Sequence, residues 1–493
     1  MSRGFNDPEL RHKKHELPVE SGTYFSSIAL AVWDNIHGPK LLHVWTGINQ
    51  RDDDRKLVTI ANFTLNDEAG RNQEGIETKF YSLPKHGVIA TAFVFSLEMV
   101  EGKQDVFSFF LILPYHEISE YLARHNFCQD KVEKLLDDHF VAHVTQRSTE
   151  KVLLNEKVHK VIMEHFTRPL HSFTELMASL RAYAVPHPID IKQTFLTDIE
   201  SESHFLRKAI TSHLQTGGYT VVLGQDAESV NRMILTLGLF LTSKEQKTSR
   251  LLCSPMQVPT EDGEGVNIGQ PYTYESGLYL QGYTAVENGL LPFSKSQLED
   301  NCMPSTIINM DKQEVWVFNI NLANYIRERS ERIRKSEEDK KAARKSTRNP
   351  ISYSDSEMCL YDSCDKVLDS SLVHVFLREV QLLPVSTPGV IESYTTQFIR
   401  LLNLKALALV KYVEAELKAA AEQQTSLGER TFQLPASTSR LNTNQMMQNL
   451  TITTEGDLRV IVTKAERIRP KTCLDVLDSQ EPAAKVLAEF ATF

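Results

Sequence analysis

Five runs of strand-forming residues lie in the N-terminal part of the chain, in the order two strands, a helix and three strands. Short segments that contain glycine or proline separate them, such as residues 34–39 and 84–87, and these residues favour tight turns. Helices grouped around an antiparallel sheet form an α+β layer domain. The pattern therefore predicts a five-stranded antiparallel sheet with helices packed on it. The predicted strands are residues 24–33, 40–45, 78–83, 87–97 and 105–113, and the predicted helices are residues 57–65, 116–124 and 130–141.

The rest of the chain must form at least one further domain. The sequence has 493 residues, whereas a single hydrophobic core usually stops growing at about 250–300 residues. Residues 205–242 predict a helix, a strand and a second helix, an alternation typical of an α/β domain with a mostly parallel sheet. Further predicted strands are residues 277–282, 314–320 and 458–462, and further predicted helices are residues 366–382 and 391–423.

The amino-acid composition excludes several classes of protein. Hydrophobic residues make up 41% of the chain and charged residues 24%, which excludes wholesale disorder. The 54 basic and 64 acidic residues give a net charge of −10, so the chain lacks the basic excess of most nucleic-acid-binding proteins. The six cysteines are too few and too scattered for a disulfide scaffold. No apolar run is long enough to span a membrane, and we expect a soluble, cytoplasmic protein that is at most peripherally attached to membranes.

Motifs for catalysis, metal binding or cofactor binding are not recognisable. Residues 217–224 resemble a phosphate-binding loop, but Gln225 follows where a P-loop needs lysine. Asp226 is more simply explained as the N-cap of the next helix. Cys359 and Cys364 have no second pair of ligands downstream to complete a zinc site. We therefore expect no catalytic residue, no metal ion and no cofactor.

A basic stretch covers residues 327–348, with ten Lys or Arg, five Asp or Glu and a net charge of +5. The simplest interpretation is a solvated helix with pairs of opposite charge. Contact with an anionic membrane or an acidic partner is the second, and a nuclear-localisation or nucleic-acid patch is the third. The candidates for the second interpretation are Arg332, Arg334, Lys335, Lys340, Lys341, Arg344 and Lys345.

The turn that follows the first predicted strand contains Trp33, Asp34 and Asn35. In one interpretation, Trp33 belongs to the core and the two polar side chains bond to the turn backbone. In the other, the three residues form an exposed tip that docks another protein, since tryptophan is enriched among interface hot spots. The three residues are therefore candidates for a protein-docking site.

Six ordered blocks of the sequence closely resemble the chromosome nine open reading frame seventy-two family, which are longin/DENN proteins. The blocks are residues 31–40, 209–224, 236–242, 274–282, 406–414 and 454–458. The N-terminus and residues 245–270, 327–348 and 424–449 match this family poorly. The chain therefore resembles an ortholog or a close relative of the members of this family.

The resemblance implies a multidomain α+β and α/β fold, with a longin domain followed by a DENN domain. Combined with the predicted elements, it gives a disordered tail (1–21), the longin domain (22–148), a helical connector (149–200), the central α/β part of the DENN domain (201–330), a basic and polar linker (331–365) and its helical C-terminal part (366–493) with a polar loop (424–449).

The resemblance also implies a function. Family members are implied to pair with a second longin/DENN protein, the Smith–Magenis-region partner, and through it with a WD-repeat protein. This complex is implied to regulate Rab and Arf GTPases in autophagy and endosome–lysosome traffic, with recruitment to those membranes and a nuclear fraction as further locations. Because the arginine finger is attributed to the partner, none is assigned here, and Trp33, Asp34 and Asn35 are implied to face the GTPase. A stand-alone Rab exchange factor and a non-catalytic scaffold for membrane recruitment are the alternatives.

Overall fold

The computed structural model describes residues 12–17, 24–47, 54–66, 75–100, 103–146, 154–198, 204–252, 257–258, 266–267, 274–284, 291–299, 304–318, 364–384, 386–426 and 443–477. The chain divides into two compact units. The first unit is Met1–Ala184 with Ala342–Ser346, and the second is Val185–Lys341 with Thr347–Phe493.

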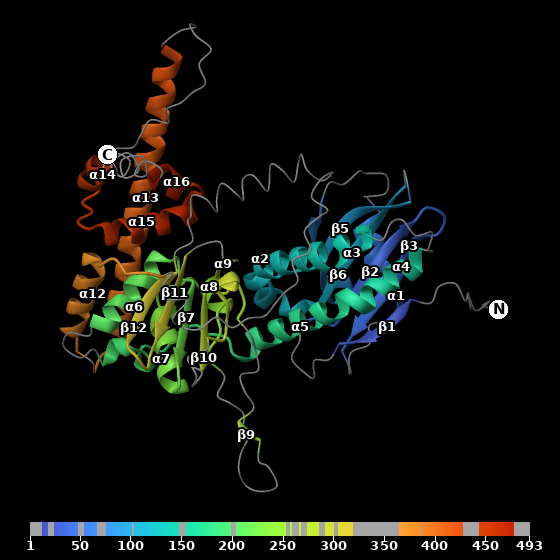
Figure 1. Cartoon of the computed structure of the whole chain (residues 1–493), viewed down its shortest axis with the longest axis horizontal. Helices are drawn as coiled ribbons and strands as arrows, with labels where there is room; N and C mark the ends of the chain where they lie inside the picture. Colours follow the sequence, from blue (N-terminus) through green and yellow to red (C-terminus); the bar gives the residue numbers. More distant parts are fainter. Residues whose placement is uncertain are drawn as a thin grey trace, which may run out of the picture. The chain divides into compact units, whose positions relative to one another are not determined.

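A six-stranded sheet forms the centre of the first unit, in the order β1-β3-β2-β6-β5-β4 (Figure 1). Every pairing from β3 to β4 is antiparallel, so the predicted five-stranded antiparallel sheet is confirmed. The strands are β1 (Lys13–Glu16), β2 (Ser27–Asp34), β3 (Gly38–Thr46), β4 (Glu77–Leu83), β5 (Val88–Val100) and β6 (Lys103–Pro114).

Strand β1 is a correction to the predicted disordered tail over residues 1–21. It pairs in parallel with the edge strand β3, and the backbone N–H of Leu17 continues the pairing by donating to the carbonyl of Thr46 at 2.9 Å. The Leu17 side chain is fully buried. A short segment thus gains order because an otherwise open sheet edge offers it backbone partners.

Helices cover both faces of this sheet. Helix α1 (Asp54–Leu65) buries Leu57, Ile60, Ala61 and Leu65 against small residues of the strands. The opposite face carries aromatic side chains, against which α2 (Ile118–Leu135), α3 (Ala142–Gln146), α4 (Leu154–Val161) and α5 (Thr167–Ala182) pack. The π-helical segments η4 (Leu136–Val141) and η5 (Ile162–Phe166) join α2 to α3 and α4 to α5.

Two boundaries differ from the sequence prediction. The predicted break between residues 124 and 130 is absent, because α2 runs through it with Phe127 and Cys128 buried. Residues 154–182, expected in a connector, belong to the first unit. Phe166 explains this placement, since its ring lies 5.6 Å from that of Phe109 on the sheet.

The second unit contains a five-stranded sheet in the order β10-β7-β11-β12-β13. The predicted parallel pairing holds for β7 with β10 and β11, whereas β12 and β13 add antiparallel pairs. Its strands are β7 (Thr220–Gly224), β10 (Leu280–Thr284), β11 (Ser305–Asn309), β12 (Glu314–Phe318) and β13 (Cys364–Asp365). The helices beside it are α6 (His204–Gln215), α7 (Ala227–Gly238), α8 (Ser243–Lys247) and α9 (Lys295–Glu299), and β8 (Gln257–Val258) pairs separately with β9 (Val266–Asn267).

Helices form the C-terminal part of the second unit. They are α12 (Ser371–Gln381), α13 (Pro388–Ser426), α14 (Thr443–Asn449), α15 (Glu455–Ile468) and α16 (Thr472–Leu477). The predicted strand over residues 458–462 is wrong, because these residues lie in α15. Val460, Ile461 and Val462 are all buried, and a short run of consecutive apolar residues does not distinguish a buried strand from a buried helix.

The predicted polar loop over residues 424–449 is partly wrong as well. Its first residues end α13, and residues 443–449 form α14, which buries Met446 completely. The remainder, residues 427–442, lies outside the described residues.

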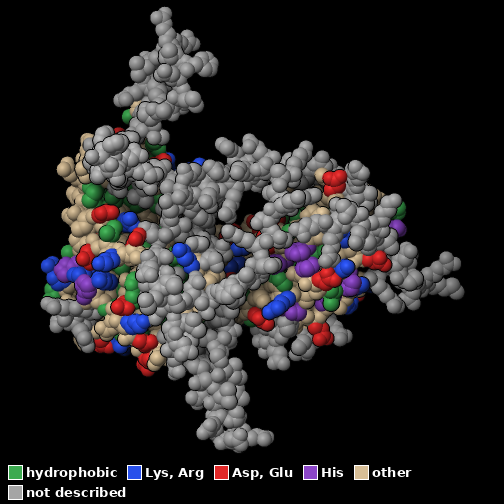
Figure 2. All heavy atoms as spheres, viewed as in Figure 1, with side chains coloured by type: hydrophobic (Ala, Val, Ile, Leu, Met, Phe, Trp, Pro, Cys, Tyr) green, Lys and Arg blue, Asp and Glu red, His purple; other side chains and the backbone are tan. Residues whose placement is uncertain are grey.

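In the part of the chain that the structure describes, no helix combines the length and apolarity needed to cross a bilayer. Basic and acidic side chains are interspersed on the face drawn in Figure 2.

Candidate functional site

The turn between β2 and β3 brings the three candidate docking residues together. The Asp34 carboxylate accepts hydrogen bonds from the backbone N–H groups of Ile36 (2.8 Å) and His37 (3.2 Å). These bonds lower the pKa of Asp34 below its usual value. Asn35 accepts a hydrogen bond from the Trp33 indole N–H at 3.1 Å. The turn is therefore held by its own side chains.

The burial of Trp33 lies between the two interpretations, and docking through the turn stays a prediction. Its half-buried ring packs against the apolar cluster beneath α1, while Asn35 is exposed and Ile36 is 85% exposed. The turn thus exposes the apolar side chain of Ile36 beside the Asp34 carboxylate. The seven basic candidates between Arg332 and Lys345 lie outside the described residues.

A histidine cluster lies where β1 meets β3. The His15 and His43 rings are joined by a 2.7 Å nitrogen–nitrogen hydrogen bond, and the ring of His159 from α4 stacks on His43 at 5.4 Å. Burial, with added repulsion from His15, His159 and Lys13, lowers the pKa of His43 to about 3. Burial also lowers the pKa values of His15 and His159. The cluster is therefore neutral in the folded protein at neutral pH.

Acid is expected to loosen the β1–β3 edge. The unfolded state takes up protons at a pKa of about 6.5 while folded His43 does not, so stability falls as pH drops from about 6.5 towards 3, by about 1.4 kcal/mol per pH unit for one such histidine. Hydrogen exchange of the β1 and β3 amides, corrected for intrinsic rates, should show roughly fivefold lower protection at pH 5.5 than at 6.5. His43→Gln should reduce that dependence, and His37→Gln in the exposed turn should not. Equal protection at both pH values would contradict the expectation.

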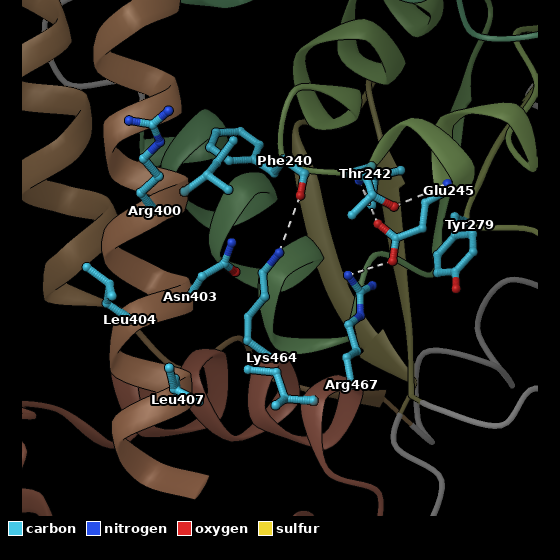
Figure 3. A pocket seen from close by; sticks show the side chains of 13 residues that line it. Phe240, Thr242, Glu245, Tyr279, Arg400, Asn403, Leu404, Leu407, Lys464 and Arg467 are labelled. Atoms are coloured by element: carbon cyan, nitrogen blue, oxygen red, sulfur yellow. Dashed lines mark hydrogen bonds and ion pairs between the residues drawn. The ribbon is translucent and has the colours of Figure 1, made fainter. Parts of the chain in front are cut away.

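A groove in the second unit has a volume of about 970 Å³ (Figure 3). Four segments build it: the loop after α7 with α8, Tyr279 just before β10, the middle of α13, and the C-terminal half of α15. Its lining is Phe240, Leu241, Thr242, Glu245, Tyr279, Ile399, Arg400, Asn403, Leu404, Leu407, Lys464, Arg467 and Ile468.

An ion pair closes one end of this groove. Arg467 contacts Glu245 at 2.7 Å and donates to the carbonyl of Gly217. Glu245 is fixed from its other side, because its second oxygen accepts the backbone N–H of Thr242 at 2.7 Å in a capping box. The charge of Glu245 is thus already matched by Arg467.

Lys464 lies beside this ion pair, and its hydrogen bond to the protein is longer than the contact between Arg467 and Glu245. Its ammonium donates to the carbonyl of Phe240 at 3.4 Å, and Figure 3 shows it pointing from α15 towards that loop. Burial and the neighbouring Arg467 lower the pKa of Lys464 to about 8. An anion placed here would restore the favourable environment that the ammonium lacks.

Sequence reasoning missed the groove. Two signals were available: the capping-box pattern of Thr242 and Glu245, and the three-residue spacing of Lys464 and Arg467, which places them on one helix face. The prediction of a strand at residues 458–462 hid the second signal. The third wall lies on α13, far away in the sequence.

Comparisons with known proteins agree with the resemblance seen in the sequence. Residues 59–321 match the C9orf72-like protein family. The chain is 30% identical over 484 residues to the guanine nucleotide exchange factor C9orf72 of Homo sapiens and to its Rattus norvegicus homolog, covering 93% of this chain and 92% of each relative. Among solved structures, the K. lactis Lst4 longin domain is similar at 7% identity and a TM-score of 0.21, over 29% of this chain and 99% of that one. The family match covers more than half of the chain and the two relatives nearly all of it, so the predicted family is confirmed and this chain belongs to the C9orf72-like protein family.

Proposed function

We propose that this protein regulates small GTPases as a guanine nucleotide exchange factor. The observation that supports the proposal is the 30% identity over 93% of the chain to proteins named as such factors. Exchange requires binding energy directed at the nucleotide-free state of the GTPase and no obligatory catalytic side chain. A chain without a recognisable catalytic motif suits that chemistry.

The finer assignment proposes a longin domain in the first unit and a DENN domain in the second. The antiparallel sheet from β3 to β4 with helices on both faces supports the former, and the parallel strands β10, β7 and β11 flanked by helices support an α/β core for the latter. We further propose Rab or Arf substrates, a second longin/DENN protein as partner, a WD-repeat protein bound through it, and a cytoplasmic site of action on endosomes, lysosomes and autophagosomes.

The proposed contact with the GTPase is the β2–β3 turn. Trp33, Asp34 and Asn35 are held together by their own hydrogen bonds, so docking would cost little ordering of the turn. The exposed Ile36 offers an apolar contact beside the Asp34 charge. This pairing suits a basic or polar switch surface.

A nucleotide-release assay tests the proposal. The full chain, alone and with its longin/DENN partner, is added to a panel of Rab and Arf proteins loaded with fluorescent GDP, and GTP hydrolysis is followed separately. We expect faster release, and Trp33→Ala/Asp34→Lys should reduce the stimulation by at least about tenfold, as for loss of an interface hot spot. The control is Phe80→Ala/Glu77→Lys, which makes the same residue-type changes on β4, where both side chains are exposed.

The outcomes separate the alternatives. Faster hydrolysis only with the partner would replace exchange by a role in an activating complex. No effect on either rate would leave a scaffold. Equal loss in the control variant would contradict docking through the turn while leaving exchange itself intact.

A further inference from the structure

The groove of the second unit is apolar along most of its length. Leu404 and Leu407 of α13 and Ile468 of α15 are 65%, 44% and 47% exposed. Apolar side chains gathered in a concave site, rather than scattered singly on a surface, mark a place where a ligand binds. A volume of about 970 Å³ is within the range of small-molecule sites.

Charge in this groove is unbalanced. Three cations line it, Arg400, Lys464 and Arg467, against the single carboxylate of Glu245. Since Arg467 is already paired with Glu245, two positive charges remain for a ligand. The groove thus favours an anion at the end where Lys464 lies, next to apolar walls.

The polar groups available limit what else could bind. Apart from the charged residues, the lining offers only the polar side chains of Thr242, Asn403 and Tyr279, and the Thr242 hydroxyl already accepts the backbone N–H of Glu245. An extended peptide brings a backbone donor and acceptor with every residue, more than these side chains can satisfy. A ligand with one polar end and a long apolar body matches the groove better.

We propose that this groove binds a single-chain lipid with an anionic headgroup, the headgroup meeting Lys464 and the acyl chain lying along Leu404, Leu407 and Ile468. This site is separate from the turn proposed to dock the GTPase, so the two proposals stand independently. The lowered pKa of Lys464 agrees with it, because a bound anion would stabilise the charged ammonium.

Calorimetric titration of the full chain with lipids below their aggregation concentrations tests the proposal. The probes are 1-oleoyl-lysophosphatidate, oleate, the neutral monooleoylglycerol and inorganic phosphate. We expect one binding site for both anionic lipids, with a dissociation constant on the order of 10–100 μM, comparable to the binding of one acyl chain to a bilayer. The neutral lipid should bind at least about tenfold more weakly, and phosphate alone should not bind measurably.

Variants separate the contribution of the Lys464 charge to lipid binding from that of the apolar side chains. Lys464→Met should weaken the anionic lipids about tenfold or more, leaving the neutral lipid unchanged. Leu404→Gln/Leu407→Gln should weaken all three lipids. The matched controls are Lys411→Met and Leu401→Gln on α13, whose side chains are exposed and do not line the groove. Circular dichroism checks that each variant is folded.

The pH dependence gives a second readout. An arginine side chain keeps its charge throughout this pH range, and burial keeps the pKa of the nearby His213 at about 3. Lys464, with a pKa lowered to about 8, therefore loses its charge as the pH rises past that value. Affinity for oleate should therefore fall between pH 7 and 9, and Lys464→Arg, which keeps its charge, should remove most of that fall. Equal affinity for anionic and neutral lipids, binding unaffected by Lys464→Met, or no binding would overturn the proposal.

Discussion

Replacing Asp457 with alanine is expected to destabilise the second unit by at least about 1.5–3 kcal/mol, the contribution of one hydrogen bond to a charged group, because four such bonds are lost together. The residue is 1% exposed. Its carboxylate accepts the hydroxyl groups of Ser370 (2.5 Å), Ser371 (2.6 Å) and Thr453 (2.9 Å) and the backbone N–H of Leu372 (3.0 Å). Alanine would leave all four donors without this acceptor, and the loss is costly at Ser370, whose side chain is buried.

The hydrogen bonds of Asp457 hold together segments that lie far apart in the sequence. The four donors come from the start of α12 and from the segment before α15, so one carboxylate ties two helices together. The backbone at Gly456 of α15 lies very close to the segment that precedes α12, because a Cβ added to Gly456 would lie 2.2 Å from the carbonyl oxygen of Asp369. No side chain can be accommodated at that contact without moving α15.

Hydrogen exchange of the α12 and α15 amides measures this effect in the second unit, with Glu455→Ala, exposed two residues earlier on α15, as the control. Burial raises the pKa of Asp457, but the bonds from Ser370, Ser371 and Leu372 outweigh it and hold the pKa below its usual value. The carboxylate therefore stabilises the fold above the unfolded pKa, and this contribution is lost as pH falls through the folded pKa. A loss below 1 kcal/mol in Asp457→Ala would contradict the role given to the carboxylate.

Replacing Phe166 with alanine is expected to cost the first unit about 3–5 kcal/mol, the usual range for a buried phenylalanine. Its side chain is 1% exposed, and its ring lies 5.6 Å from Phe109, 5.8 Å from Phe140 and 6.1 Å from Trp45. These rings come from β6, η4 and β3, so the cavity would open between the sheet and the helices that cover it.

Hydrogen exchange measures the destabilisation of the first unit by itself. Such a measurement is needed because a chain of two units need not unfold in one step. The β6 amides should lose protection in Phe166→Ala and keep it in Met163→Ala, which removes a side chain that is 52% exposed on the same segment. Equal protection of the β6 amides in both variants would contradict the packing of residues 154–182 on the sheet.

Local sequence patterns predicted the elements whose signals are local. The strands β2 to β6 were predicted from runs of apolar residues punctuated by Pro84, Gly87 and similar turn residues, and α7 from its apolar face after the N-cap Asp226. In each case the hydrophobic period and the flanking residues agree. For these strands, the structure adds the order in which they pair in the sheet.

Elements that depend on distant partners were missed. Strand β1 forms because β3 offers it a free edge, and α15 is buried on several sides by α6 and α13, which removes the amphipathic period from residues 458–462. The same reason applies to the candidate sites. The β2–β3 turn is continuous in sequence and was predicted, whereas the groove joins residues near 242, 403 and 464 that only the fold brings together.

The most direct test of the proposed function is the affinity of the full chain for one GTPase in three states: nucleotide-free, GDP-bound and bound to a GTP analogue. Binding and exchange are linked, so an exchange factor must weaken nucleotide binding by the same factor by which nucleotide weakens its own binding. We expect the nucleotide-free GTPase that shows the fastest release to bind about 100-fold more tightly than either loaded form. Equal affinity for all three states, or tightest binding to the GTP-analogue form, would contradict exchange-factor activity.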